Sequence, residues 1–200
     1  MNVVALDEAT LAAWTALFDA CDCTCFCRYW HFEGTKNDWL ARSAMRPEDN
    51  RDEQIALVRS GRPEGRGLLA MDGPAAIGWM KLTPRARLPK LLRQGAYRPL
   101  ALGPDEGIWS VGCLLVHPRH RGAGVARALI GAAAGHVRMW EQPGRPCAIE
   151  AYPRGCPAGV EPSRLHDEEA WAGTPALFAS CGFVQIAGEA AYPVMRRVVG

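Results

Sequence analysis

Apolar residues near the start of the chain recur at the spacing of amphipathic helices. The first such segment places four large side chains on one face: Leu11, Trp14, Leu17 and Phe18. The helices predicted in this way span residues 8–20, 36–45 and 48–59. Residues 21–32 are rich in cysteine and aromatic side chains and show no helical periodicity, so we expect an irregular or extended segment there.

From residue 66 onward the pattern changes to short apolar runs. Two of these runs flank Asp72-Gly73, a dipeptide typical of hairpin turns, and they predict a hairpin of residues 66–71 and 75–82. Further strands are predicted over 108–116, 146–152, 183–187 and 194–199, with a helix over 122–140 and a short helix before Gly182. This order of helices, a hairpin and then alternating strands and helices predicts a mixed α/β fold.

Length, charge and hydropathy limit the classes of function. The 200 residues predict a single domain, 1–200, that can bury a sizeable core. A net charge of +2 gives no reason to expect a nucleic-acid partner. The chain has no run of about 18 apolar residues that would predict a membrane span, and it starts without the features of a secretory signal. We therefore expect a cytoplasmic protein with eight reduced cysteines.

The run 114–130 has the features of an anion site. An apolar strand end is followed by a turn that contains Gly122 and Gly124 and opens a predicted helix. Glycines leave backbone N–H groups uncovered, and such groups at a helix N-terminus bind phosphate. Over residues 107–140 the chain has four arginines and no Asp or Glu. The turn therefore predicts a ligand that carries phosphate.

Two common phosphate loops do not match this turn. A P-loop needs Gly, four residues and then Gly-Lys-Ser/Thr, which the chain lacks, and a dinucleotide-binding turn needs a third glycine where the chain has Arg127. What remains is the pattern Arg121-x-x-Gly124-x-Ala126 after a strand that ends Val-x-Pro. This pattern resembles the acetyl-CoA pyrophosphate loop of the GNAT superfamily of N-acetyltransferases.

A second match lies downstream of the glycine turn. Residues 176–184 look like the family's late helix, which ends in Gly-Phe and enters a strand, and glycine suits the left-handed position that ends a helix. The resemblance covers about residues 65–199. It implies a mixed, mostly antiparallel central sheet flanked by helices, with an N-terminal helical extension. We accordingly divide the single domain into a helical, cysteine-rich part, 1–64, and an acetyl-CoA-binding core, 65–200.

The resemblance implies direct transfer of an acetyl group from acetyl-CoA to an amine acceptor in a ternary complex. In the family, the pantetheine arm pairs with the main chain of the strand before the turn, as an added strand would. The residues expected to bind the cosubstrate are Cys113, Leu114, Leu115, Val116, Arg121, Gly122, Ala123, Gly124, Val125 and Ala126. The sequence does not indicate which amine is acetylated, and we expect a monomer or a homodimer.

The acceptor amine must lose a proton before it attacks the thioester. The candidate bases are Glu150, at the end of a predicted strand, and Glu106, just before the predicted central strand. Four acidic residues in the long segment before the late helix would form a lip that attracts a cationic amine: Glu161, Asp167, Glu168 and Glu169. A plain solvated surface is the alternative interpretation of each of these carboxylates.

The late helix departs from the family pattern at one position. Many family members have a tyrosine four residues before the Gly of the Gly-Phe pair, where its hydroxyl protonates the departing thiolate. Here that position is Phe178, so Ser180, Cys181 or a water molecule would substitute. The thiolate could also leave unprotonated, because a thiol pKa is only about 8.5.

The run Cys21-x-Cys23-x-Cys25-x-Cys27 raises the question of a metal site. Structural zinc sites usually space their thiols two to four residues apart. In an extended chain, every second thiol would lie about 7 Å from the next, which is too far for one ion. We therefore expect no metal and interpret the run as small apolar thiols that could line the acceptor site.

Two functions from other classes remain open as alternatives to an acetyltransferase. The first is a non-catalytic acyl-CoA-binding regulatory protein that kept the fold after losing the tyrosine. The second is a thiol-rich metal-binding module. Binding of CoA separates the enzyme and the regulatory protein from the metal-binding module. Release of a thiol in the presence of an amine separates the enzyme from the regulatory protein.

Overall fold

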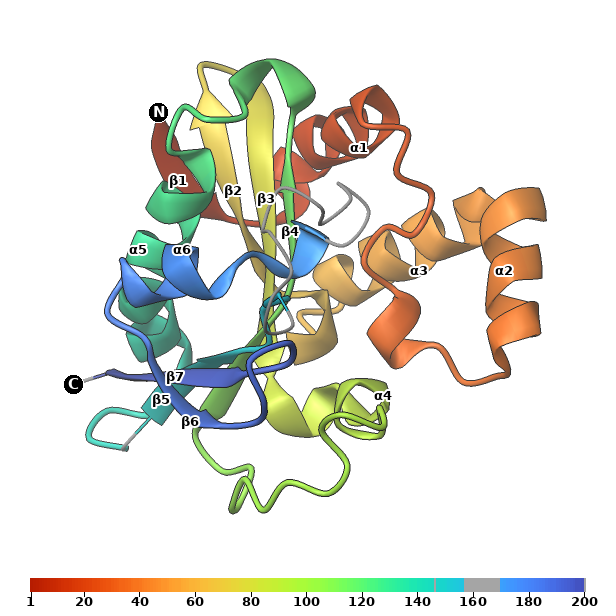
Figure 1. Cartoon of the computed structure of the whole chain (residues 1–200). Helices are drawn as coiled ribbons and strands as arrows, with labels where there is room; N and C mark the ends of the chain where they lie inside the picture. Colours follow the sequence, from red (N-terminus) through yellow and green to blue (C-terminus); the bar gives the residue numbers. More distant parts are fainter. Residues whose placement is uncertain (146, 157–169, 200) are drawn as a thin grey trace.

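A mixed sheet of seven strands forms the centre of the computed structural model (Figure 1), which describes residues 1–145, 147–156 and 170–199. The strands are β1 (Asn2–Ala5), β2 (Gly67–Asp72), β3 (Ala75–Pro84), β4 (Ile108–Val116), β5 (Cys147–Ala151), β6 (Val184–Ala187) and β7 (Val194–Val199). Their order is β1-β2-β3-β4-β5-β7-β6, and every neighbouring pair is antiparallel except β4 and β5. This arrangement confirms the predicted mixed, mostly antiparallel sheet.

Helices cover both faces of this sheet. They are α1 (Leu11–Ala20), α2 (Lys36–Met45), α3 (Pro47–Arg59), α4 (Pro89–Leu92), α5 (Val125–Trp140) and α6 (Pro175–Ala179). In Figure 1, α5 and α6 lie on one side of the sheet, and α1, α2 and α3 lie on the other. The three predicted N-terminal helices are confirmed, the first of them with a 3₁₀ turn, Glu8–Thr10, before α1.

Helix α5 covers the first face of the sheet with one apolar stripe. Val125, Leu129, Ile130 and Val137 are buried against side chains from β2, β3, β4 and β5. Gly78 on β3 lets the start of the helix approach, because a Cβ there would lie 2.4 Å from a Val125 methyl carbon. This packing fixes the N-terminus of α5, and the turn before it, against the end of β4.

Aromatic side chains fill the second face between α1 and β3. Trp14, Phe18 and Trp79 are fully buried, with the Trp14 ring centroid 4.8 Å from that of Phe18 and 6.0 Å from that of Trp79. Each large aromatic side chain removes about 150–250 Å² of surface from water, so this cluster holds α1 firmly on the sheet. The α1 helix in turn positions the cysteine-rich segment that follows it.

The structure differs from the sequence-based expectations at the N-terminus. Residues 2–5 form β1, which pairs with residues 68–71 of β2, although no strand was expected there. Four residues are too few to show a strand period, and the pairing partner lies more than sixty positions away in the sequence. The N-terminal part, 1–64, is therefore not purely helical, because it adds an edge strand to the sheet of the core.

Two further points concern the rest of the chain. The four acidic residues of the predicted lip, Glu161, Asp167, Glu168 and Glu169, lie outside the described residues.

None of the helices in the described part of the chain is both long and apolar enough to cross a membrane.

Candidate active site

Strand β4 is open along half of one edge. It pairs in parallel with β5 only over residues 108–111, opposite residues 148–151. Strand β5 ends at Ala151, whereas β4 continues to Val116. Within the described chain, the edge of residues 112–116 that faces away from β3 therefore has no paired strand. An extended group can align with such an edge through backbone N–H and C=O groups.

A β-bulge marks the point where β4 and β5 separate. Lys81 of β3 pairs with Cys113 and Leu82 pairs with Val111, so Gly112 is the extra residue of β4. The Trp30 indole N–H donates a hydrogen bond of 2.8 Å to the Gly112 carbonyl. A bulge re-aims the backbone groups of its strand, and the indole of Trp30 fixes this one in position.

A cleft of about 570 Å³, here called the arm cleft, follows the open edge of β4. One wall is β4 residues 112–115, and the facing wall is the cysteine segment 21–27. Trp171, from the short 3₁₀ helix Ala170–Ala172, borders the cleft and stacks near Trp30 with 5.4 Å between ring centroids. The cleft is mainly apolar along its length, as the arm of a large cofactor requires.

A second cavity of about 290 Å³, here called the loop cavity, lies over the glycine turn. Gly122 and Gly124 have φ of +75° and +81°, a left-handed conformation that glycine adopts without strain. Gly124 is the N-cap of the sixteen-residue helix α5, and no side chain caps the first turn there. An atom added at either glycine would meet nothing within 4 Å, so the backbone of the turn is open to a ligand.

The arm cleft and the loop cavity meet at Arg121, which lines both of them. The predicted cosubstrate-binding residues divide between them: Cys113, Leu114 and Leu115 line the arm cleft, and Val116, Gly122, Gly124, Val125 and Ala126 line the loop cavity. Ala123 lines neither. The fold thus places nine of the ten predicted residues around two cavities that adjoin at Arg121, one at the N-terminus of α5 and one along β4 to its bulge.

A third cavity, of about 360 Å³, lies on the far side of the bulge and is here called the aromatic cavity. It shares four residues with the arm cleft, namely Tyr29, Trp30, Gly112 and Trp171. Tyr97, Tyr152 and Tyr192 complete its aromatic lining. The bulge of β4 is therefore accessible from two directions, through the arm cleft and through the aromatic cavity.

Glu150, the first candidate base, is fully buried in β5 beneath this region. Arg85 Nη1 donates to both of its carboxylate oxygens at 3.1 and 3.2 Å, and Arg196 Nε donates at 3.0 Å. The Tyr152 hydroxyl donates to Oε2 at 2.6 Å. These donors surround both oxygens, so the geometry argues against the predicted role of Glu150 as a base. It instead indicates an ion-pair centre that ties β5 to β7 and to the segment after β3.

The other two candidate catalytic residues lie away from the bulge. Glu106 is exposed in the loop before β4, and Ser180 is exposed after α6, where its hydroxyl donates to the Leu177 carbonyl at 2.7 Å. Neither residue lines the cavities described above. Phe178 is fully buried and packs against Phe183, with 5.2 Å between ring centroids. Its ring therefore contributes to the core rather than presenting a group to the cleft.

The cysteine run is irregular, which is one of the two geometries that we expected, and it is not extended. Residues 21–27 form successive turns, with positive φ at Asp22, Phe26 and Cys27. The Sγ atoms of Cys23 and Cys25 are 3.6 Å apart rather than about 7 Å. Among the described residues, no group of three or more His, Cys, Asp or Glu side chains is placed to hold a metal ion.

The thiols of this run differ in their electrostatic environment. Hydrogen bonds from the Cys23 and Cys27 thiols hold the pKa of Cys25 well below its usual value. Burial raises the pKa of Cys27, whose sulfur accepts a hydrogen bond of 3.2 Å from the Trp79 indole. Cys25 is therefore the thiol of the run whose pKa is lowered rather than raised, which favours its reactive thiolate form.

Sequence reasoning missed two residues that shape the site. Trp30 borders all the cavities around the bulge, yet it lies about eighty positions before Gly112. Tyr152 lines the aromatic cavity, and burial raises the pKa of its hydroxyl well above the usual value. The only signal for Tyr152 was its place two positions after Glu150, which puts both side chains on one face of a strand.

The chain was compared with known proteins. The model of the family described as "Acetyltransferase (GNAT) family" matches residues 26–144, which is more than half of the chain. No curated protein matches the chain at a significant level.

Solved structures show the same fold. An aminoglycoside 6′-N-acetyltransferase complexed with coenzyme A has a TM-score of 0.54 at 12% identity, and the match covers 100% of this chain and 98% of that one. A GCN5-related N-acetyltransferase from Kribbella flavida has a TM-score of 0.52 at 18% identity, covering 98% and 96% of the two chains. The PaiA N-acetyltransferase from Thermoplasma acidophilum, in complex with coenzyme A, has a TM-score of 0.52 at 10% identity, covering 98% and 99%.

At these low sequence identities, the similarity to the solved structures establishes only the fold. The match to the family model establishes that the chain is a member of the family. The chain belongs to the GNAT family of acetyltransferases.

Proposed function

We propose that this chain is an N-acetyltransferase that transfers the acetyl group of acetyl-CoA directly to an amine. The observation that carries the proposal is a pair of cavities that share Arg121, one over the uncapped N-terminus of α5 and the other along β4 to the bulge at Gly112. The structural relatives crystallised with coenzyme A support the same cosubstrate. The pyrophosphate would bind at the glycine turn and the pantetheine arm would lie in the arm cleft.

The geometry suits direct attack rather than a covalent enzyme intermediate. With the arm in its cleft, the thioester would lie at the bulge, where backbone N–H groups of the open edge can stabilise the oxyanion. The acceptor amine would approach through the aromatic cavity, on the other side of Gly112. Holding both reactants at one point supplies much of the rate enhancement. Attack of the amine forms the carbon–nitrogen bond and the oxyanion, and the carbon–sulfur bond breaks when the carbonyl re-forms. The nitrogen loses one proton and the sulfur gains one, so CoA leaves as a thiol.

We further propose that the enzyme works in the cytoplasm, as a monomer or homodimer. All eight cysteines are unpaired in the structure, which agrees with a reducing compartment.

Acetyl-CoA is expected to raise the melting temperature of the protein by about 5–10 °C at a hundred times its Kd. A ligand that binds only the folded state stabilises it by about 2.7 kcal/mol at that concentration, and each kcal/mol shifts Tm by about 2–4 °C in a chain of this size. Differential scanning calorimetry measures the shift. Stabilisation by NAD or ATP, with none by acetyl-CoA, would overturn the proposed cosubstrate.

Saturating CoA is expected to slow alkylation of Cys25 by iodoacetamide about tenfold or more, because Cys25 faces the arm cleft with a lowered pKa. Mass spectrometry of peptides from samples quenched at successive times gives the rate. Cys156 lies outside the described cavities and serves as the internal control, labelled equally with and without CoA. Equal labelling of Cys25 in both samples would show that the arm does not occupy this cleft.

Steady-state release of thiol in the presence of amines separates the enzyme from a non-catalytic CoA-binding protein. A thiol-reactive dye reports the CoA that is released. We expect turnover with at least one amine and none without amine. Tight binding of acetyl-CoA with no turnover on any amine would favour the regulatory alternative.

A further inference from the structure

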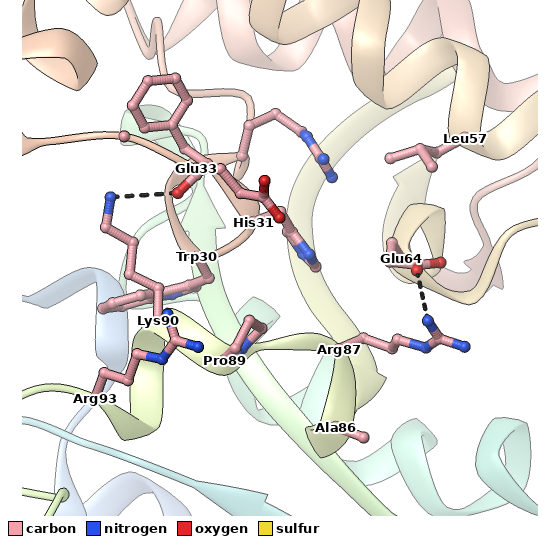
Figure 2. Close-up of a pocket in the computed structure, with 13 residues that line it drawn as sticks. Trp30, His31, Glu33, Leu57, Glu64, Ala86, Arg87, Pro89, Lys90 and Arg93 are labelled. Carbon is pink, nitrogen blue, oxygen red and sulfur yellow. Dashed lines mark hydrogen bonds and ion pairs between the residues drawn. The ribbon is translucent and has the colours of Figure 1, made fainter.

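A fourth cavity, of about 750 Å³, lies across Trp30 from the bulge and is here called the basic cavity (Figure 2). Its polar lining comes from Arg28, His31, Glu33, Glu64, Arg87, Lys90 and Arg93. These residues come from the segment after the cysteine run, from the region of α4 and, for Glu64, from the 3₁₀ helix Pro63–Gly65. In Figure 2, Arg87 extends toward Glu64, and Lys90 and Arg93 lie on the other side of Pro89. The volume lies in the range of small-molecule sites.

The buried guanidinium of Arg28 lacks partners for part of its donor set. Arg28 is 4% exposed, and its Nη2 is paired with Glu53. Its Nε and Nη1 are buried and have no hydrogen-bond partner among the described residues, and neither does Nε2 of His31. Leaving a charged donor buried and unpaired is costly. Native proteins rarely do so unless a ligand or water completes the site.

The charges around the cavity leave it positive. Four cationic side chains line it, namely Arg28, Arg87, Lys90 and Arg93, against two carboxylates. One of these, Glu64, is held by Arg62 at 3.2 Å and by Arg87 at 3.4 Å. The other, Glu33, is exposed at the rim. Cationic donors that converge on one cavity recognise carboxylate or phosphate groups.

Burial and the nearby positive charges lower the pKa of two neighbouring groups. Burial, together with the charge of Arg28, lowers the pKa of Lys81 to about 7. Burial, with the charges of Lys81 and Arg28, lowers the pKa of His31 to about 2. Lys81 Nζ itself is occupied, because it donates to the Gln54 side chain at 3.0 Å and to the Glu64 carbonyl.

The basic cavity adjoins the reaction point through a single side chain. Trp30 lines it, lines both cavities at the bulge, and donates its indole N–H to the Gly112 carbonyl. A small molecule whose charged end is held in the basic cavity could therefore extend past Trp30 into the aromatic cavity, where its amine would reach the bulge. We propose that the basic cavity binds the anionic group of a small-molecule acceptor, either a carboxylate or a phosphate. The amine of this acceptor would be acetylated beside the bulge at Gly112, and the proposal therefore rests on the proposed function.

The first measurement tests anion binding without any reaction. Inorganic phosphate and succinate are titrated by calorimetry into protein saturated with CoA, so that the glycine turn is already occupied. We expect at least one of these anions to bind saturably. Lys90→Gln combined with Arg93→Gln should weaken that binding about tenfold or more, because charge-assisted hydrogen bonds contribute about 1.5–3 kcal/mol each.

Two further variants control this measurement. Arg98→Gln removes the same charge from an exposed position five residues after Arg93 and outside the cavity, and should leave anion binding unchanged. Arg28→Gln should also abolish anion binding, but it breaks the ion pair with Glu53. If Arg28→Gln does not fold, the Lys90/Arg93 double variant is the decisive test. Absence of anion binding in the wild type, or an equal loss in Arg98→Gln, would overturn the proposal.

The second measurement tests the acceptor. Alkylamines, ω-amino carboxylates and aminoalkyl phosphates of increasing length are compared by thiol release. We expect kcat/KM for one anionic series to exceed that of the matched alkylamines by about tenfold or more. The double variant should lose this preference mainly through a higher KM for the anionic amines. Alkylamines that react as well as both anionic series would overturn the proposal.

The two measurements separate two kinds of failure. If acetyl-CoA binds but no amine of any series is acetylated, the proposed transfer fails and the acceptor assignment fails with it. If amines are acetylated without preference for an anionic group, the transfer stands and only the assignment of the basic cavity is wrong.

Discussion

Gly124→Asp is expected to weaken CoA binding by about a hundredfold or more, because it places a carboxylate where the pyrophosphate would meet the N-terminus of α5. The variant should fold, since a Cβ at this position meets nothing within 4 Å. Asp is also among the residues that tolerate a left-handed conformation, here a φ of +81°. Loss of one or two charge-assisted hydrogen bonds is enough for the expected effect.

Gly124→Asn is the matched control. Its side chain has nearly the same size and the same tolerance of positive φ, but no charge. Titration calorimetry with CoA should therefore show a much smaller loss for Gly124→Asn than for Gly124→Asp. If Gly124→Asp binds CoA as tightly as the wild type, the glycine turn is not the phosphate site. If the two variants lose affinity equally, steric access rather than charge controls the site.

Glu150→Gln is expected to lower the free energy of unfolding by about 3 kcal/mol or more. The buried carboxylate is the partner of Arg85, which is 1% exposed, and of Arg196, which is 27% exposed. Removing one member of such a buried network leaves the remaining charges uncompensated, which typically costs about 3–5 kcal/mol. Denaturant unfolding monitored by tryptophan fluorescence measures the change.

Glu106→Gln provides the comparison for this variant. Glu106 is exposed, so its substitution should change stability by no more than about 0.5 kcal/mol. Acetyl transfer should be measured on both variants below their unfolding transitions. If Glu150→Gln keeps its stability but loses most of its kcat, Glu150 would be the base after all, and the ion-pair role would be wrong.

Local sequence patterns predicted most of the elements and the glycine turn before α5. The helical spacing of residues 8–20 and 36–45 and the Asp72-Gly73 turn depend on neighbours close in the chain, so the sequence contains the whole signal. The same holds for the glycine turn, because positive φ and an uncapped helix N-terminus are properties of a few adjacent residues. Strand β1 was missed because its only partner, β2, is distant in sequence.

The chemical roles of side chains were decided by tertiary structure. Glu150 looked like a base because nothing in the sequence shows that Arg85 and Arg196, which are far away along the chain, converge on it. The basic cavity was invisible for the same reason, since Arg28 and α4 are some sixty residues apart. A carboxylate's basicity and a cavity's charge depend on which groups lie within a few ångströms, and only packing brings those groups together.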